Sequence, residues 1–252
     1  MSELRKAFHE ELDSVRASVI RLGAMVTELI PRGTASLLDA DIEATARILA
    51  SDDDVDSLSL EIEDRCYELL ARQQPMAADL RSIMTAIRLT GDLERSADLV
   101  MNISKATRRL HGLTIDPKLR GLIARMSEQA QHLFISAIDA YADGNADLGA
   151  AIDDMDSRLD ELHAEYIRTI FAVYSQLNGG SDLPAAVQLA LVGRYYERLG
   201  DHAVNVGEHT VFMVTAVRAE HLGAERAMRR AVNASTTPAD PTNSSSPPPA
   251  ES

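Results

Sequence analysis

The sequence predicts an all-helical protein made of two tandem antiparallel three-helix bundles that are related by an internal repeat. Helical periodicity runs almost from end to end and is interrupted only at clusters rich in proline, glycine or Asp/Asn. Aromatic residues make up only 4% of the chain, while Ala, Leu, Ile and Met are plentiful, which suits helices packed on helices. The third observation is a carboxylate motif that occurs on two long helices at a constant offset.

Six long helices are expected, because short turn signals separate six periodic segments. Pro75 begins the third helix, and the pair Asp116-Pro117 begins the fourth, since proline in a first turn costs no hydrogen bond and Asp is a good N-cap. Short connections make successive helices antiparallel neighbours. The expected helices span about residues 3–38, 39–72, 75–110, 116–142, 146–177 and 182–222.

These helices divide the chain into two repeats and a tail. Residues 1–112 form the first repeat and residues 113–230 the second. Residues 231–252 are rich in Ser and Pro and lack the apolar residues that folding requires, so we expect a disordered tail.

Charge and composition exclude several classes of protein. The net charge of −14 repels phosphate backbones and anionic lipid headgroups, so nucleic acid is not an expected partner. Cys66 is the only cysteine, which rules out an intramolecular disulfide. The N-terminal segment lacks an apolar signal-peptide core, and no apolar run approaches the roughly 18 residues of a membrane helix. We therefore expect a cytoplasmic protein without direct membrane insertion.

The repeated motif is the most informative feature of the sequence. Its two copies stand 103 residues apart at both carboxylates, from 94 to 197 and from 98 to 201. Each copy reads Glu-Arg-x-x-Asp with an Asn four residues later: Glu94, Arg95, Asp98 and Asn102 in the first, and Glu197, Arg198, Asp201 and Asn205 in the second.

The spacing of the motif points to a cation site. Residues four apart share a helix face, so each Glu and Asp carry like charges side by side, and they repel each other unless a proton, an arginine or a cation compensates them. Asp56 and Asp156, on the preceding helices, are further candidate ligands from the facing helix of each repeat. A hard cation held by carboxylate oxygens and an ion pair with the adjacent arginine both remain open, and they can coexist. A solvated Glu-Arg pair is the competing interpretation, but two copies in register favour the cation.

The histidines give no comparable signal. His202 follows Asp201 directly but points about 100° around the helix from it, so we expect exposure or packing rather than ligation. The other histidines show no shared spacing: His9, His111, His132, His163, His209 and His221.

These residues resemble the PhoU family over about residues 1–225. The resemblance rests on Gln74-Pro75-Met76-Ala77-Ala78-Asp79-Leu80-Arg81, on Leu93 to Asp98, and on Glu197 to Val206. The Ala- and Arg-rich helices are compatible with an actinobacterial member. The first copy departs from the family pattern at Ser96-Ala97, where an apolar residue and Gly are common, and Ile152 interrupts the acidic run that its counterpart Asp52 begins.

The resemblance implies paired three-helix bundles and a function in phosphate homeostasis. PhoU proteins are cytoplasmic negative regulators that link the phosphate ABC transporter and its ATPase subunit to a sensor histidine kinase. They are often homodimers, and they hold multinuclear iron or zinc through the repeated motif. Carried over, the ligands are Glu94, Asp98, Glu197 and Asp201, with Asp56 and Asp156 as second-rank candidates.

An alternative function is a metal-dependent enzyme of the carboxylate-bridged cluster type. Ferritin-like di-iron sites use Glu-x-x-His on two helices, and no Glu in the chain precedes a His by three residues. A purely structural bundle that dimerises through a helix face also remains open. We therefore expect an adaptor rather than an enzyme.

Overall fold

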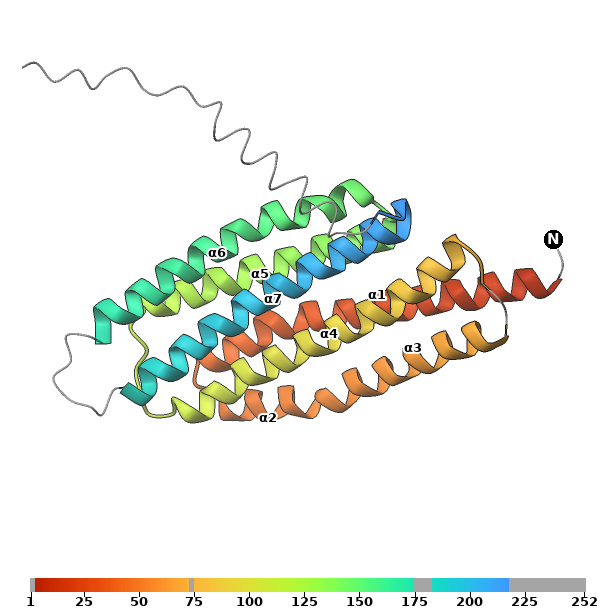
Figure 1. The fold of residues 1–252 in the computed structure, drawn as a ribbon. Coiled ribbons are helices and arrows are strands. Elements are labelled where there is room, and N and C mark those ends of the chain that lie inside the picture. The colour runs from red at the N-terminus through yellow and green to blue at the C-terminus, as the bar shows by residue number, and fades with distance from the viewer. Residues whose placement is uncertain (1–2, 73–74, 175–182, 218–252) are drawn as a thin grey trace, which may run out of the picture.

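In the computed structural model the described residues are 3–72, 75–174 and 183–217, and they form seven α-helices without a strand. Figure 1 shows the helices side by side in an elongated bundle. Their bounds are α1 Glu3–Leu38, α2 Ile42–Ala50, α3 Asp52–Arg72, α4 Ala78–Arg109, α5 Pro117–Asp143, α6 Ala146–Tyr174 and α7 Leu183–Thr215.

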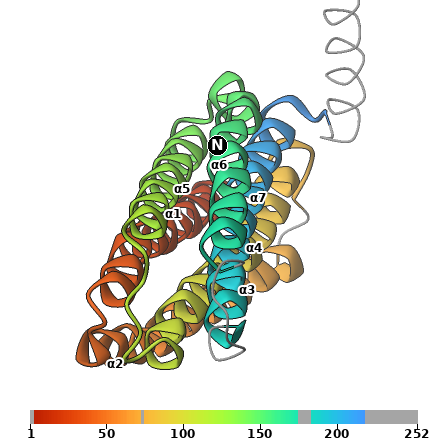
Figure 2. The ribbon, with the colours of Figure 1, turned by 90° about the vertical axis from the view of Figure 1, so that its left-hand side faces the viewer.

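The helices form two antiparallel bundles that share one core, as the all-helical prediction required. Helices α1 to α4 make the first bundle, and α5, α6 and α7 make the second. Across the boundary α4 lies against α7 and α1 lies against α5, which the end view in Figure 2 also shows. Buried apolar side chains from both bundles belong to a single cluster. The boundary is therefore packed like the interior of one domain.

The predicted second helix is wrong in one respect, because it breaks into α2 and α3 at Ser51. The Ser51 N–H and side-chain hydroxyl both bond to the Ile48 carbonyl, at 3.0 and 2.7 Å, and so close α2. Three aspartates, from Asp52 on, then occupy the first turn of α3, where negative charge favours a new helix start. The counterpart α6 has buried Ile152 at the equivalent position and runs on unbroken.

Two predicted helix ends also shift. The third helix starts at Ala78 rather than at Pro75, after Ala77 adopts a left-handed φ of 47°. The last helix ends at Thr215 rather than at residue 222, and Ala216 follows with φ 63°. The start of α5 is confirmed, because the Asp116 carboxylate accepts the Lys118 N–H at 2.8 Å. Residues 175–177 and the tail lie outside the described residues.

A buried hydroxyl cluster fixes the position of the two bundles relative to each other. Thr34 Oγ1 on α1 lies 2.7 Å from Ser127 Oγ on α5 and 2.7 Å from Tyr196 Oη on α7. Buried polar groups are costly unless they are paired, so the cluster favours this one register of the three helices.

None of the helices in the described ranges combines the length and the apolar character that crossing a membrane requires.

Candidate functional site

The first carboxylate cluster lies where α4 faces α3. Glu94 is partly buried on α4, while Asp98 on α4 and Asp56 on α3 are exposed. Burial raises the pKa of Glu94 above its ordinary value, and the negative charges of Asp56 and Asp98 raise it further. The predicted meeting of the motif with the preceding helix is thus present in the first repeat.

The second cluster repeats this arrangement where α7 faces α6. Glu197 is partly buried and Asp201 is exposed on α7, and Asp156 projects from α6. Burial raises the pKa of Glu197, and the charge of Asp201 adds to it. Arg194, one turn earlier on α7, pairs with Glu197. This cation is not the Arg198 of the motif.

Asp156 is the least compensated carboxylate of the two clusters. Its Oδ1 atom is buried and has no hydrogen-bond partner. Burial raises the pKa of Asp156 to about 7, and the negative charges of Asp160, Asp201, Asp153 and Glu197 raise it in the same direction. A cation or a proton at this position would therefore relieve both the lost solvation and the repulsion.

A stripe of glycines on α7 explains why the Oδ1 atom of Asp156 is buried while Asp56 is exposed. A Cβ atom at Gly200 would collide with the Asp156 carboxylate, so only glycine leaves room for it. Gly193 and Gly207, seven residues away on either side, likewise meet α6 closely. The counterparts on α4, at the offset of 103, are the larger residues Thr90, Ala97 and Ser104.

The arginines and asparagines of the motif do not behave as copies of each other. Arg95 donates from Nε to the Gly91 carbonyl at 2.9 Å and lies 3.9 Å from Asp92. Arg198 makes no ion pair or hydrogen bond with any other described residue. Asn205 donates to Asp92 at 3.4 Å, whereas Asn102 has no such bond within the described ranges. Among these residues, neither motif arginine therefore forms an ion pair with the Glu or Asp of its own motif.

The described side chains do not form a preorganised metal cage. Among residues 3–72, 75–174 and 183–217, no three His, Cys, Asp or Glu side chains converge closely enough to hold an ion. The candidate ligands of each repeat are neighbours, so they would have to draw together around a cation.

A buried polar cluster that the sequence analysis missed joins the two repeats. Asp92 on α4 is only 6% exposed. His202 Nδ1 on α7 lies 3.0 Å from Asp92 Oδ1, and His209 Nε2 lies 3.4 Å from Oδ2. Burial alone would raise the pKa of Asp92, but the hydrogen bonds from both histidines outweigh it and hold that pKa well below its usual range.

The sequence carries one signal for this cluster, the spacing between His202 and His209, which was not considered because His202 was set apart from the other histidines. His202 and His209 are seven residues apart, which places them on one face of α7. His202 is buried, as the packing interpretation allowed, but it is also bonded to a carboxylate. Asp92 has Tyr195 as its counterpart at the offset of 103, so the repeat itself gives no signal for this cluster.

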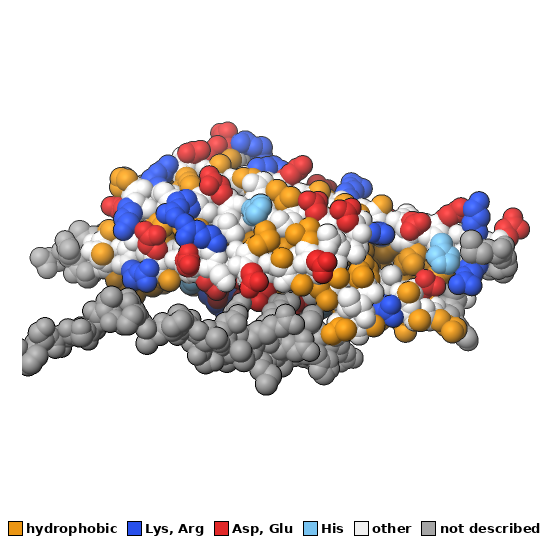
Figure 3. Space-filling view, turned by 90° about the horizontal axis from the view of Figure 1, so that it is seen from above, with side chains coloured by type: hydrophobic (Ala, Val, Ile, Leu, Met, Phe, Trp, Pro, Cys, Tyr) orange, Lys and Arg blue, Asp and Glu red, His pale blue; other side chains and the backbone are white. Residues whose placement is uncertain are grey.

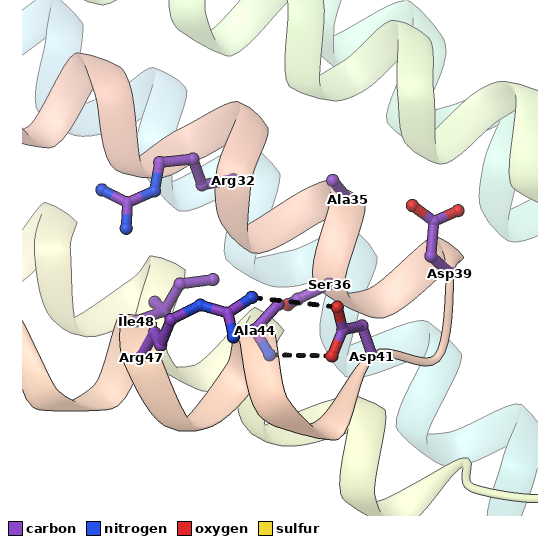
Figure 4. A pocket seen from close by; sticks show the side chains of 8 residues that line it. All are labelled: Arg32, Ala35, Ser36, Asp39, Asp41, Ala44, Arg47 and Ile48. Carbon is purple, nitrogen blue, oxygen red and sulfur yellow. Dashed lines mark hydrogen bonds and ion pairs between the residues drawn. The ribbon is translucent and has the colours of Figure 1, made fainter.

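A cavity of about 240 Å³ lies apart from both clusters, between the end of α1 and α2 (Figure 4). Asp41 caps α2 through a 2.8 Å bond from the Ala44 N–H, and it lies 4.0 Å from Arg47. The charges of the lining balance, so nothing in it selects a ligand. The lining residues are Arg32, Ala35, Ser36, Asp39, Asp41, Ala44, Arg47 and Ile48.

Comparison with known proteins matches both repeats to one family. The family model described as the PhoU domain matches residues 19–107 and 123–210. The chain is 30% identical to the phosphate-specific transport system accessory protein PhoU homolog 2 of Mycobacterium tuberculosis, over 84% of this chain and 98% of the relative. It is also 30% identical to the PhoU homolog of Clostridium acetobutylicum, over 84% of this chain and 95% of the relative.

Solved structures agree with this fold. The crystal structure of PhoU from Pseudomonas aeruginosa matches with a TM-score of 0.78 and 26% identity, covering 83% of this chain and all of that one (100%). The phosphate transport system regulatory protein PhoU from Streptococcus pneumoniae matches in fold with a TM-score of 0.76 at 23% identity, covering 83% and 98% of the two chains.

Proposed function

Because this chain belongs to the PhoU family, we propose that it is an accessory protein of a phosphate-specific transport system and regulates that system. The observation that carries this proposal is the match of the family to both repeats, together with relatives bearing this name that the chain matches over nearly their whole length. Fold alone would not carry it, because one fold hosts many functions.

The finer proposal is that the protein acts as an adaptor and represses the phosphate-starvation response when phosphate is plentiful. It would dock the ATPase subunit of the phosphate ABC transporter and a sensor histidine kinase, as a homodimer in the cytoplasm. The two carboxylate clusters are suitable docking surfaces, because each combines exposed carboxylates with a partly buried glutamate on facing helices. Acidic surfaces of this kind favour basic patches on a partner.

We also propose that the clusters bind a cation, with iron or zinc as the candidates. The all-carboxylate donor set fits a hard cation, and the unpaired, buried Oδ1 of Asp156 supports a site in the second repeat. When bound, the cation would supply positive charge that cancels the repulsion. Glu197, Asp201 and Asp156 would hold it there, and Glu94, Asp98 and Asp56 would hold it in the first repeat.

A reporter experiment tests the regulatory proposal. We expect the double variant Glu94→Ala, Glu197→Ala to derepress phosphate-starvation genes in rich phosphate while remaining helical by circular dichroism. The matched control is Glu61→Ala, Glu161→Ala, which removes one exposed glutamate from α3 and one from α6. Normal repression in the first variant, or equal derepression in the control, would show that the motif carboxylates do not regulate.

Elemental analysis tests the cation. The protein is purified without a metal-binding tag or chelator, and its iron and zinc contents are compared with those of the same double variant. We expect a metal content in the wild type that falls in the variant. Equal contents in both proteins would remove the motif glutamates as ligands and leave the clusters as protein-docking surfaces.

The enzyme alternative finds no support in the comparisons, because the relatives are named as accessory and regulatory proteins. Turnover that follows the metal content and is lost in Asp98→Asn would restore it. Light scattering after gel filtration tests the homodimer, which a monomer mass at working concentration would refute.

A further inference from the structure

One end of the molecule combines basic and apolar side chains, although the protein as a whole is acidic. We call this end the basic tip. It is formed where α4 and α6 end and where α5 and α7 begin, at the left of Figure 1. Its charged and apolar members are Arg108, Arg109, Lys118, Arg125, Arg168, Leu113, Phe171, Leu183 and Val187.

Contacts between the four helices hold the basic tip together. Arg109 at the end of α4 donates to Gln188 on α7 at 3.2 Å. Lys118 at the start of α5 lies 3.9 Å from Glu165 near the end of α6, and Arg125 lies 3.9 Å from the same carboxylate. At this end of the molecule α4 is thus joined to α7, and α5 is joined to α6.

The charge of the basic tip is opposite to that of the whole chain. Five basic side chains, on residues 108, 109, 118, 125 and 168, stand on these four helix ends with the acidic residues Asp116 and Glu165. Asp39, Asp41 and Glu43 lie nearby at the end of α1 and the start of α2, because Arg120 on α5 bonds to the Leu38 carbonyl. The complete chain has 39 acidic and 25 basic residues. Figure 3 shows several Lys and Arg side chains at the end where α5 begins and α6 ends, with Asp and Glu side chains among them. The basic tip is thus less acidic than the molecule as a whole.

The apolar side chains of the basic tip are unusually exposed. Phe171 on α6 is 69% exposed and Leu183 on α7 is 67% exposed. Val187, one turn into α7, is 49% exposed, and Leu113, between α4 and α5, is 50% exposed. These side chains stand on three separate segments around an end of the bundle. An arrangement of apolar side chains surrounded by cations suits a broad, flat partner with an apolar layer beneath an anionic one.

We propose that the basic tip binds peripherally to the surface of an anionic phospholipid bilayer. The phenyl and leucyl side chains enter the boundary between headgroups and acyl chains, and the guanidinium and ammonium groups pair with lipid phosphates. The acidic remainder of the molecule points away from the bilayer. The net charge of the whole chain predicts repulsion from anionic headgroups. Charges farther away than a Debye length of about 8 Å are screened, however, so the local charge of the basic tip decides the interaction.

Vesicle flotation with the purified full chain tests this proposal. The probes are vesicles of phosphatidylcholine alone and vesicles in which phosphatidylglycerol replaces about a third of it, at low and physiological salt. We expect binding to the anionic vesicles only, weakened by salt. Phe171→Ser with Leu183→Ser should lower the partition coefficient about tenfold or more. Lys118→Gln with Arg168→Gln should lower it about thirtyfold, at about one kcal/mol per cation.

The matched control places the same change at the opposite end. Met76 and Leu80 at the start of α4 are 77% and 40% exposed, and Met76→Ser with Leu80→Ser should leave vesicle binding within about twofold of the wild type. Failure of the wild type to float with anionic vesicles at low salt would overturn the proposal. An equal loss of vesicle binding in the Met76→Ser, Leu80→Ser control would also overturn it, and so would tip variants that bind the anionic vesicles as well as the wild type does.

Discussion

Replacing Asp156 by Asn should stabilise the metal-free protein, although it removes a side chain of the candidate cation site. Burial and four neighbouring negative charges raise the pKa of Asp156 from 3.8 to about 7. At about 1.4 kcal/mol per pKa unit, this shift corresponds to roughly 4 kcal/mol against the ionised form in the folded state. Because the side chain is partly exposed, screening by solvent reduces the expected gain to about 2 kcal/mol at pH 8.

The pH dependence of this gain distinguishes it from a generic surface effect. The pKa of Asp156 is higher in the folded state than in the unfolded one. Its contribution to the stability of the wild type is therefore fully present below pH 3.8, and it is lost as the pH rises toward 7. The difference between variant and wild type should therefore fall from about 2 kcal/mol at pH 8 to about 1 kcal/mol at pH 5.5, and stay constant above pH 7.5.

Urea unfolding followed by circular dichroism, in a chelator and at several pH values, measures the difference. The control is Asp56→Asn, because Asp56 is the exposed counterpart in the first repeat, and it should change the free energy of unfolding by less than about 0.5 kcal/mol. The reasoning from burial would be refuted if Asp156→Asn were no more stable than the wild type at pH 8, or if its gain in stability did not change with pH. With zinc added, the wild type should gain more stability than the variant.

Three further perturbations test other parts of the structure by urea unfolding. Gly207→Ala should lower the free energy of unfolding by about 2–3 kcal/mol, since its Cβ would meet the Gly149 carbonyl. The control Gly121→Ala has open space around its Cβ and should raise the free energy of unfolding by about 0.5 kcal/mol. Equal effects would contradict the close approach of α6 and α7. Asp92→Ala should lower the free energy of unfolding by about 3 kcal/mol near neutral pH. The loss should shrink as the pH falls below about 4, because protonation of Asp92 in the wild type breaks its pairing with the two histidines. A loss that does not depend on pH would contradict this pairing. Tyr196→Phe should cost about 1 kcal/mol by removing one buried hydroxyl bond, and a neutral result would mean that the cluster is not stabilising.

Sequence reasoning succeeded where the relevant interactions are local or repeated. The cap formed by Asp116 and the position of Pro117 are set by a few adjacent residues, so their pattern is enough to predict the start of α5. Periodicity and the constant offset likewise place Asp56 against Glu94 on facing helices. The break at Ser51 had a local signal too, a serine followed by three aspartates, but helical periodicity masked it.

The rest depends on how closely distant helices approach each other. The Asp156 carboxylate fits against α7 because position 200 is a glycine, whereas the counterpart position on α4 is Ala97. The pairing of Asp92 with α7 joins side chains more than 100 residues apart, with no copy elsewhere in the chain. Neither feature leaves a periodic or repeated pattern, so a single sequence does not reveal it.

The bond between Asp92 of one repeat and the two histidines of the other has a mechanical consequence. If α7 slid along α4 by one helical turn, about 5.4 Å, the buried carboxylate would lose its donors, at a cost of about 3–5 kcal/mol. The hydroxyl cluster that joins α1, α5 and α7 opposes the same movement. The two buried clusters therefore make the seam between the repeats resist sliding, so that the repeats move as one body and the seam does not act as a hinge.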